Sequence, residues 1–173
     1  MNTTANKITI GRIVLIPVYL LLAYTGHMYI ALAVYIIACI SDIVDGYVAR
    51  NFNQISNFGK FADPLADKML VLSAMCFFVE VGQMPGWVVA LVLFREFGVS
   101  GLRLIAVEKG RVIAAAKSGK LKTGCTMVGL GAMMVFTGSE LVNIIVNAVI
   151  LITTLYSGAE YFYVNRDVFA EAD

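Results

Sequence analysis

The chain has 173 residues, of which 60% are hydrophobic and only 14% are charged, whereas a soluble domain has ~45–50% apolar and ~25% charged residues. A small soluble domain could not bury so much apolar surface, and a disordered chain requires the opposite composition. The formal net charge of +1 lacks the basic excess typical of nucleic-acid binding, so no nucleic-acid partner is expected. The composition therefore predicts an integral membrane protein.

Six apolar stretches approach the ~20 residues that a helix needs to cross a bilayer. No long linker or internal repeat separates them, so residues 1–173 are expected to form a single membrane domain of the all-α class. The six transmembrane helices are predicted at Ile8–Tyr24, Met28–Asp45, Pro64–Val81, Trp87–Val107, Leu121–Phe136 and Leu141–Val164.

The basic residues predict the orientation of these helices. None of the 13 Lys and Arg residues lies in the three short turns around Gly26, Gly82 and Gly138. Because short basic loops stay in the cytoplasm, we expect both termini to be cytoplasmic in a multi-pass protein of the plasma membrane. By the same rule Lys109, Arg111 and Lys117 are interpreted as topological signals.

Four of the six aspartates are expected at two neighbouring helix ends, namely Asp42, Asp45, Asp63 and Asp67. Since Pro64 suits only the first turn of a helix, Asp63 is predicted near the cap and Asp67 one turn deeper. Carboxylates at membrane depth are costly and need a compensating role. Their oxygens suit Mg²⁺ or Mn²⁺, and a pair of such ions is a common device for displacement at phosphorus. The alternatives are a set of solvated helix-end charges and an ion path in a divalent-cation transporter.

Small and basic residues accompany the aspartates. Gly46 and Ala49 leave room for a ligand beside the second helix, and Arg50 can clamp a phosphate with two hydrogen bonds. Together these positions read Asp42-x2-Asp45-Gly46-x2-Ala49-Arg50-x8-Gly59-x3-Asp63-x3-Asp67.

This pattern resembles the signature of the CDP-alcohol phosphatidyltransferases. The resemblance implies six transmembrane helices and a reaction in which an alcohol attacks the β-phosphorus of a CDP-linked lipid and CMP leaves. It also implies that the four aspartates hold two Mg²⁺ or Mn²⁺ ions, that Asp67 acts as the general base, and that the enzyme is a homodimer. The CDP-lipid pocket implied by the resemblance contains Gly46, Ala49, Arg50 and Gly59.

Further segments resemble the members of this family whose acceptor is glycerol 3-phosphate. They are Asn6-x2-Thr9-x2-Arg12, Arg95-Glu96 with Gly101-Leu102-Arg103, and Gly119-Lys120-Leu121-Lys122-Thr123. This resemblance implies that CDP-diacylglycerol and sn-glycerol 3-phosphate are the substrates, among membrane lipids and at the cytoplasmic face. It also adds Asn6 and Thr9 to the CDP-lipid pocket.

A phosphorylated acceptor needs cations beyond those that serve the diphosphate. Arg95 lies near the middle of the fourth predicted helix, a costly place for a charge unless it faces a hydrated cavity. We expect the acceptor phosphate to be bound by Arg95, Arg103, Lys120 and Lys122. The alternatives are that Arg95 only pairs with Glu96 while the lysines snorkel to the interface, and that the acceptor is serine, inositol or phosphatidylglycerol.

Overall fold

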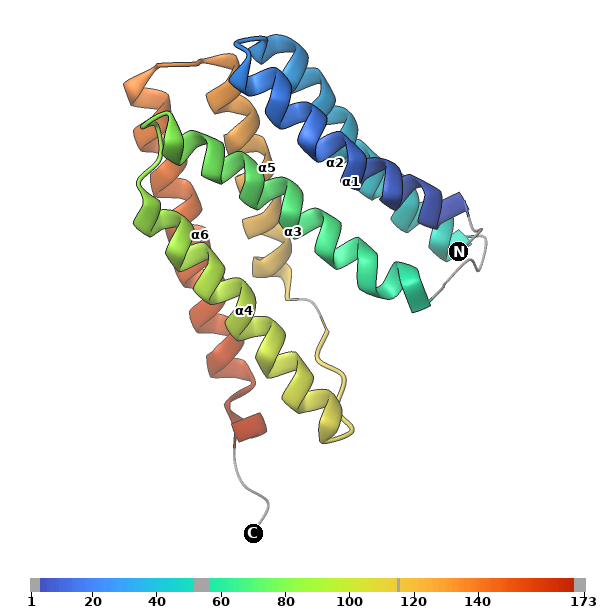
Figure 1. Cartoon of the computed structure of the whole chain (residues 1–173). Helices are drawn as coiled ribbons and strands as arrows, with labels where there is room; N and C mark the ends of the chain where they lie inside the picture. Colours follow the sequence, from blue (N-terminus) through green and yellow to red (C-terminus); the bar gives the residue numbers. More distant parts are fainter. Residues whose placement is uncertain (1–3, 52–56, 115, 170–173) are drawn as a thin grey trace.

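The computed structural model describes residues 4–51, 57–114 and 116–169, without the side chains of residues 4, 5, 43, 45–51, 57–61, 63 and 169. This part of the chain is helical throughout apart from its turns, in agreement with the predicted all-α class (Figure 1). Its elements are α1 (Thr4–Tyr24), α2 (Met28–Asn51), α3 (Asn57–Glu80), α4 (Gly86–Glu108), α5 (Lys117–Val135), α6 (Glu140–Val164) and the short 3₁₀ helix η1 (Arg166–Phe169).

All six predicted helices are present in the described residues, but α1 and α5 each begin four residues earlier than expected, and α2 and α3 are longer still. α2 continues to Asn51 and α3 begins at Asn57, so Pro64 is the eighth residue of α3. The prediction that Pro64 lies in the first turn is therefore wrong. Proline removes the hydrogen bond to the carbonyl four residues earlier, here that of Lys60, but membrane helices tolerate this loss where their surroundings satisfy the carbonyl.

Glycines end two of the helices at the predicted turns. Gly26 has φ 82° and Gly82 has φ 75°, a left-handed conformation that costs glycine little and other residues more. After Gly26 the amide of His27 donates to the carbonyl of Leu22, and after Gly82 the amide of Gln83 donates to that of Phe78. These bonds satisfy carbonyls at each helix end, and each chain reversal is therefore short.

Two pairs of successive helices pack along much of their length, α1 with α2 and α5 with α6. α3 packs mainly on α1, and α4 packs on α6, while α5 contacts α2 and so joins the two groups (Figure 1). The main core lies between them and includes the buried rings of Tyr19 and Tyr35, whose centroids are 5.7 Å apart. Toward the end of the molecule where α6 ends, α4 and α6 diverge from α1, α2 and α3.

Large apolar side chains also cover much of the outer surface. Phe94 and Phe97 on α4 are 76% and 70% exposed, and Val128 on α5 is 75% exposed. Such a surface is suited to a lipid environment and would be a liability in water. Within the described residues, two helices are long and apolar enough to span a membrane, Asn6–Tyr24 and Glu140–Val164, and a shorter apolar segment covers Met28–Asp42.

Candidate active site

A buried arginine joins two of the predicted metal ligands. Arg12 has no exposed side-chain surface, and its Nη1 atom lies 2.8 Å from Asp42 Oδ1 and 2.5 Å from Asp67 Oδ1. Its Nε atom donates to Ser41 Oγ at 3.1 Å. One guanidinium from α1 therefore holds carboxylates from α2 and α3 at a single point.

Asn6 and Thr9 lie on the same face of α1 as Arg12, because residues three apart are neighbours on a helix. Both are buried, at 1% and 0% exposure. All three polar residues of this segment therefore point into the bundle. Since Arg12 contacts Asp42 and Asp67, the helical face that carries Asn6 and Thr9 also faces the aspartate site.

The remaining positions of the aspartate pattern lie on described backbone, but their side chains are outside the described part. Asp45, Gly46, Ala49 and Arg50 lie on the last turns of α2, and Gly59 and Asp63 lie on the first turns of α3. Among the described side chains no group of three or more acidic, Cys or His residues could hold a metal.

The described pair of carboxylates nevertheless fits a divalent cation. Asp42 and Asp67 come from different helices, direct one oxygen each at the same positively charged nitrogen, and are about one-third exposed. Hard carboxylate oxygens that converge in this way are the ligands Mg²⁺ and Mn²⁺ prefer.

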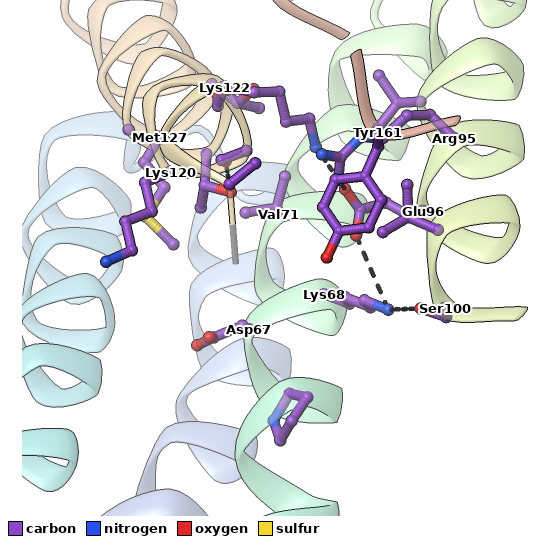
Figure 2. A pocket seen from close by; sticks show the side chains of 18 of the residues that line it. Asp67, Lys68, Val71, Arg95, Glu96, Ser100, Lys120, Lys122, Met127 and Tyr161 are labelled. Atoms are coloured by element: carbon purple, nitrogen blue, oxygen red, sulfur yellow. Dashed lines mark hydrogen bonds and ion pairs between the residues drawn. The ribbon is translucent and has the colours of Figure 1, made fainter. Parts of the chain in front are cut away.

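A cavity of about 540 Å³ opens beside Asp67 and is lined by residues of α3, α4, α5 and α6 (Figure 2). The four residues predicted to bind the acceptor phosphate all line it: Arg95, Arg103, Lys120 and Lys122. The structure therefore brings together on one cavity a set of cations from two helices, with Asp67 at its border.

Within the cavity, three cations surround the carboxylate of Glu96. Arg95 Nη1 and Lys122 Nζ each lie 2.9 Å from Glu96 Oε1, and Lys68 Nζ lies 3.8 Å from Oε2 (Figure 2). Lys68 also donates to Ser100 Oγ at 2.8 Å. The pairing of Arg95 with Glu96 is thus present, but as part of a cluster and within the cavity.

Arg103 is fixed by an aromatic residue of α6. Its Nε atom donates to the hydroxyl of Tyr161 at 2.7 Å, and its guanidinium carbon lies 5.3 Å from the centre of that ring. The Tyr161 hydroxyl in turn donates to the carbonyl of Ala114 at 3.0 Å. Because the guanidinium has five donors and this bond uses one, Arg103 can still bind an anion in the cavity.

Two basic residues interpreted as topological signals do not line the cavity and have contacts with η1. Lys109 Nζ donates to the carbonyl of Val168 at 2.9 Å, and Arg111 pairs with Asp167. Both contacts hold η1 against the end of α4, so these cations contribute to the local structure.

Sequence reasoning missed the roles of Arg12, Glu96 and Tyr161 in the geometry. The spacing of Asn6, Thr9 and Arg12 does place them on one helical face, a signal that could have predicted an inward-facing Arg12. For Glu96 the sequence indicates only the pairing with its neighbour Arg95, because its other partners, Lys68 and Lys122, lie on other helices. Tyr161 carries no local signal, since it contacts Arg103 of α4.

The comparison with known proteins identifies the family. The CDP-alcohol phosphatidyltransferase family matches residues 2–156. The chain belongs to this family. It is 38% identical to the CDP-diacylglycerol–glycerol-3-phosphate 3-phosphatidyltransferase of Bacillus subtilis, over 95% of this chain and 96% of the relative.

Other relatives have related names. A probable phosphatidylglycerophosphate synthase of Mycobacterium tuberculosis is 38% identical over 91% of this chain and 78% of its own length. A CDP-diacylglycerol–glycerol-3-phosphate 3-phosphatidyltransferase of Haemophilus influenzae is 33% identical over 92% of this chain and 91% of its own.

Family membership makes the protein a membrane-bound phosphatidyltransferase of a generally divalent-metal-dependent family. The predicted family is thereby confirmed. A divalent-cation transporter, the alternative of a different class, has no support from this match.

Proposed function

We propose that this enzyme transfers the phosphatidyl group of CDP-diacylglycerol to sn-glycerol 3-phosphate, which gives phosphatidylglycerophosphate and CMP. The names of the relatives support this acceptor. The observation that carries the proposal in this chain is the cavity beside Asp67, since five of its lining residues are cations and two are carboxylates.

The excess of cations favours an acceptor that brings its own negative charge. Serine and inositol carry no phosphate, so for them the cations would exceed the two carboxylates of the lining without a compensating anion from the acceptor. Glycerol 3-phosphate has a phosphate to bind these cations and a hydroxyl at the other end of a short chain. With its phosphate among Arg95, Arg103 and Lys122, that hydroxyl would be directed to the Asp67 side of the cavity.

In this proposal the residues of the site have separate tasks. The two divalent cations, held by Asp42, Asp45, Asp63 and Asp67, would supply charge stabilisation for the diphosphate. Asp67 accepts the proton from the acceptor's 1-hydroxyl, whose oxygen attacks the β-phosphorus while CMP leaves. Arg50 and the small residues Gly46, Ala49 and Gly59 would bind the CDP-lipid with Asn6 and Thr9, and the acyl chains would lie against apolar helix faces.

The decisive experiment supplies the purified protein with CDP-diacylglycerol and one alcohol at a time, and it measures CMP release. We expect turnover with glycerol 3-phosphate and none with serine, inositol or phosphatidylglycerol. EDTA should abolish this turnover, and Mg²⁺ or Mn²⁺ should restore it. Turnover with serine or inositol alone would refute the acceptor assignment, and full activity after exhaustive chelation would refute the role of the metals.

A further inference from the structure

Glu96 is the one carboxylate of the cavity that faces the predicted acceptor cations. Arg95 and Lys122 bind the same oxygen of Glu96 at 2.9 Å, and they are only 11% and 4% exposed. Two cations this buried would repel each other strongly if no anion stood between them, because burial weakens solvent screening. Glu96 therefore supplies the negative charge that keeps both cations in place.

Both cations retain donors that Glu96 does not use. A lysine ammonium has three donors and an arginine guanidinium has five, whereas each of these residues gives one short contact to Glu96. The Nε atom of Arg95 is buried and has no hydrogen-bond partner among the described residues. A buried donor without an acceptor costs free energy, and the side chain that carries it lines the cavity, where an anion could bind its other donors.

The neighbouring helices leave space for Arg95 in this position. A Cβ atom at Gly119 of α5 would lie 3.1 Å from Arg95 Nη2, and one at Gly158 of α6 would lie 3.2 Å from Arg95 Cγ. These distances are tighter than ordinary contacts between carbon and its neighbours. The absence of side chains at Gly119 and Gly158 thus leaves room for the Arg95 side chain in the position in which it contacts Glu96.

We propose that Glu96 is the resident counter-anion of the acceptor-phosphate site: it neutralises Arg95 and Lys122 while the cavity is empty, and the acceptor's phosphate competes with it for their donors. This inference rests on the proposed function, since it takes the phosphate of the acceptor as the competing anion. Because Glu96 competes with any anion, it prevents other small anions from occupying the site. The site then selects an acceptor that makes further contacts in addition to those of its phosphate.

The test measures the binding of inorganic phosphate by its effect on the melting temperature of the detergent-solubilised protein, without CDP-lipid. Glu96→Gln keeps the size of the side chain and removes its charge. This variant should melt at a lower temperature than the wild type without phosphate, and phosphate should stabilise it at a concentration at least about tenfold lower. Tenfold corresponds to ~1.4 kcal/mol, about the value of one charge-assisted hydrogen bond.

Two further variants control for general effects. Glu108→Gln removes an exposed carboxylate from the same helix and should leave phosphate binding unchanged. The double variant Glu96→Gln with Lys122→Gln removes one anion and one cation together, so its affinity for phosphate should return toward the wild-type value. It also provides a charge-balanced protein if the single variant does not fold.

The outcomes separate this inference from the proposed function. Unchanged or weaker phosphate binding in Glu96→Gln would overturn the counter-anion role, whichever alcohol the wild type uses. Tighter phosphate binding accompanied by a lower KM for glycerol 3-phosphate, with the KM for CDP-diacylglycerol unchanged, would support both. Tighter phosphate binding in an enzyme that turns over only with serine or inositol would support the counter-anion role and refute the proposed acceptor.

Discussion

Asp67 stands between two environments. Its Oδ1 atom accepts a hydrogen bond from Arg12, and the residue also borders the cavity that contains the acceptor cations. In Figure 2 it extends from one side of α3 while Lys68 extends from the other toward Glu96. This placement favours a carboxylate that belongs to the metal site and also reaches the attacking hydroxyl.

The first prediction concerns the proton acceptor. Asp67→Asn keeps the shape of the side chain but removes the base, so CMP release should fall by roughly 10²–10⁴-fold, the range for general-base catalysis. Binding of CDP-diacylglycerol should survive better than in Asp42→Asn, since Asp42 is proposed only as a metal ligand. Asp167→Asn, at the exposed pair with Arg111, is the control and should retain activity. Near-normal turnover in Asp67→Asn would place proton removal elsewhere.

The second prediction concerns acceptor binding. Arg103→Ala should raise the KM for glycerol 3-phosphate about tenfold or more, because losing a charge-assisted hydrogen bond costs ~1.5–3 kcal/mol. The KM for CDP-diacylglycerol should change little. Tyr161→Phe removes only the hydroxyl that holds Arg103 at 2.7 Å and should give a smaller rise of the same KM. An equal loss for both substrates in Arg103→Ala would indicate a general structural role instead.

Sequence alone could predict which residue types meet at the cavity, but only part of how they meet. Arg95 and Arg103 were predicted from the depth of a charge in an apolar helix, and both do line the cavity. The cluster around Glu96 depends on α3, α4 and α5 packing at one place, which no local pattern encodes. The roles assigned to these residues remain predictions.

Arg12 connects three helices. It extends from α1 and contacts Ser41 and Asp42 of α2 and Asp67 of α3. α1 itself is apolar on most of its surface, so this buried charge needs those partners. The first helix is thereby fixed in register against the two helices that carry the aspartate pattern.

The third prediction follows from this connection. Arg12→Met keeps a long apolar side chain and leaves Asp42 and Asp67 to repel each other. In EDTA the melting temperature should fall by about 5 °C or more, since ~1 kcal/mol corresponds to ~2–4 °C for a protein of this size. Added Mg²⁺ should raise it more than in the wild type, because a divalent cation can replace the lost positive charge. Lys7→Met, an exposed cation of the same helix, is the control. A loss that Mg²⁺ does not reduce would contradict this interpretation.

The fourth prediction concerns the packing of α5 on α6. A Cβ atom at Gly129 would lie 2.8 Å from Val146 Cγ1, so Gly129→Ala should destabilise the protein by ~1–3 kcal/mol through overpacking. Trimming the neighbour in Gly129→Ala with Val146→Ala should restore part of the melting temperature. Gly131→Ala is the control, since its nearest neighbour would lie 3.9 Å away, and it should be neutral or slightly stabilising. Additive losses in the double variant would exclude a steric cause.

The limits of α2 and α3 show why element boundaries were harder to predict than the elements. Apolar length locates the membrane core of a helix, but both helices continue past it through polar residues, to Asn51 and from Asn57. Pro64 therefore lies inside α3, although the position that proline generally prefers is the first turn of a helix. A hydropathy pattern locates only the apolar part of a helix, whereas the backbone hydrogen bonds of α2 and α3 continue through polar residues beyond that part.

At the scale of the whole molecule, the six described helices alternate in direction. α1 begins and α6 ends toward the same end of the bundle (Figure 1). The aspartates of the pattern, the end of α4 and the start of α5 belong to that end, whereas the turns after α1, α3 and α5 lie at the other. Lys and Arg are absent from those three described turns, at residues 25–27, 81–85 and 136–139. The charge asymmetry therefore coincides with the end that carries the proposed active site.

The fifth prediction is that this end faces the cytoplasm, because short basic segments remain on that side. In a variant without Cys39, Cys76 and Cys125, a single cysteine can be introduced by Ser139→Cys or by Lys117→Cys, at opposite ends of α5. A membrane-impermeant maleimide should label the Ser139→Cys protein in cells whose outer barrier is permeable to the reagent. The Lys117→Cys protein should react only after the cytoplasmic membrane is opened. The reverse labelling would place the aspartates on the far side, away from cytoplasmic glycerol 3-phosphate, and would contradict both the orientation and the proposed acceptor.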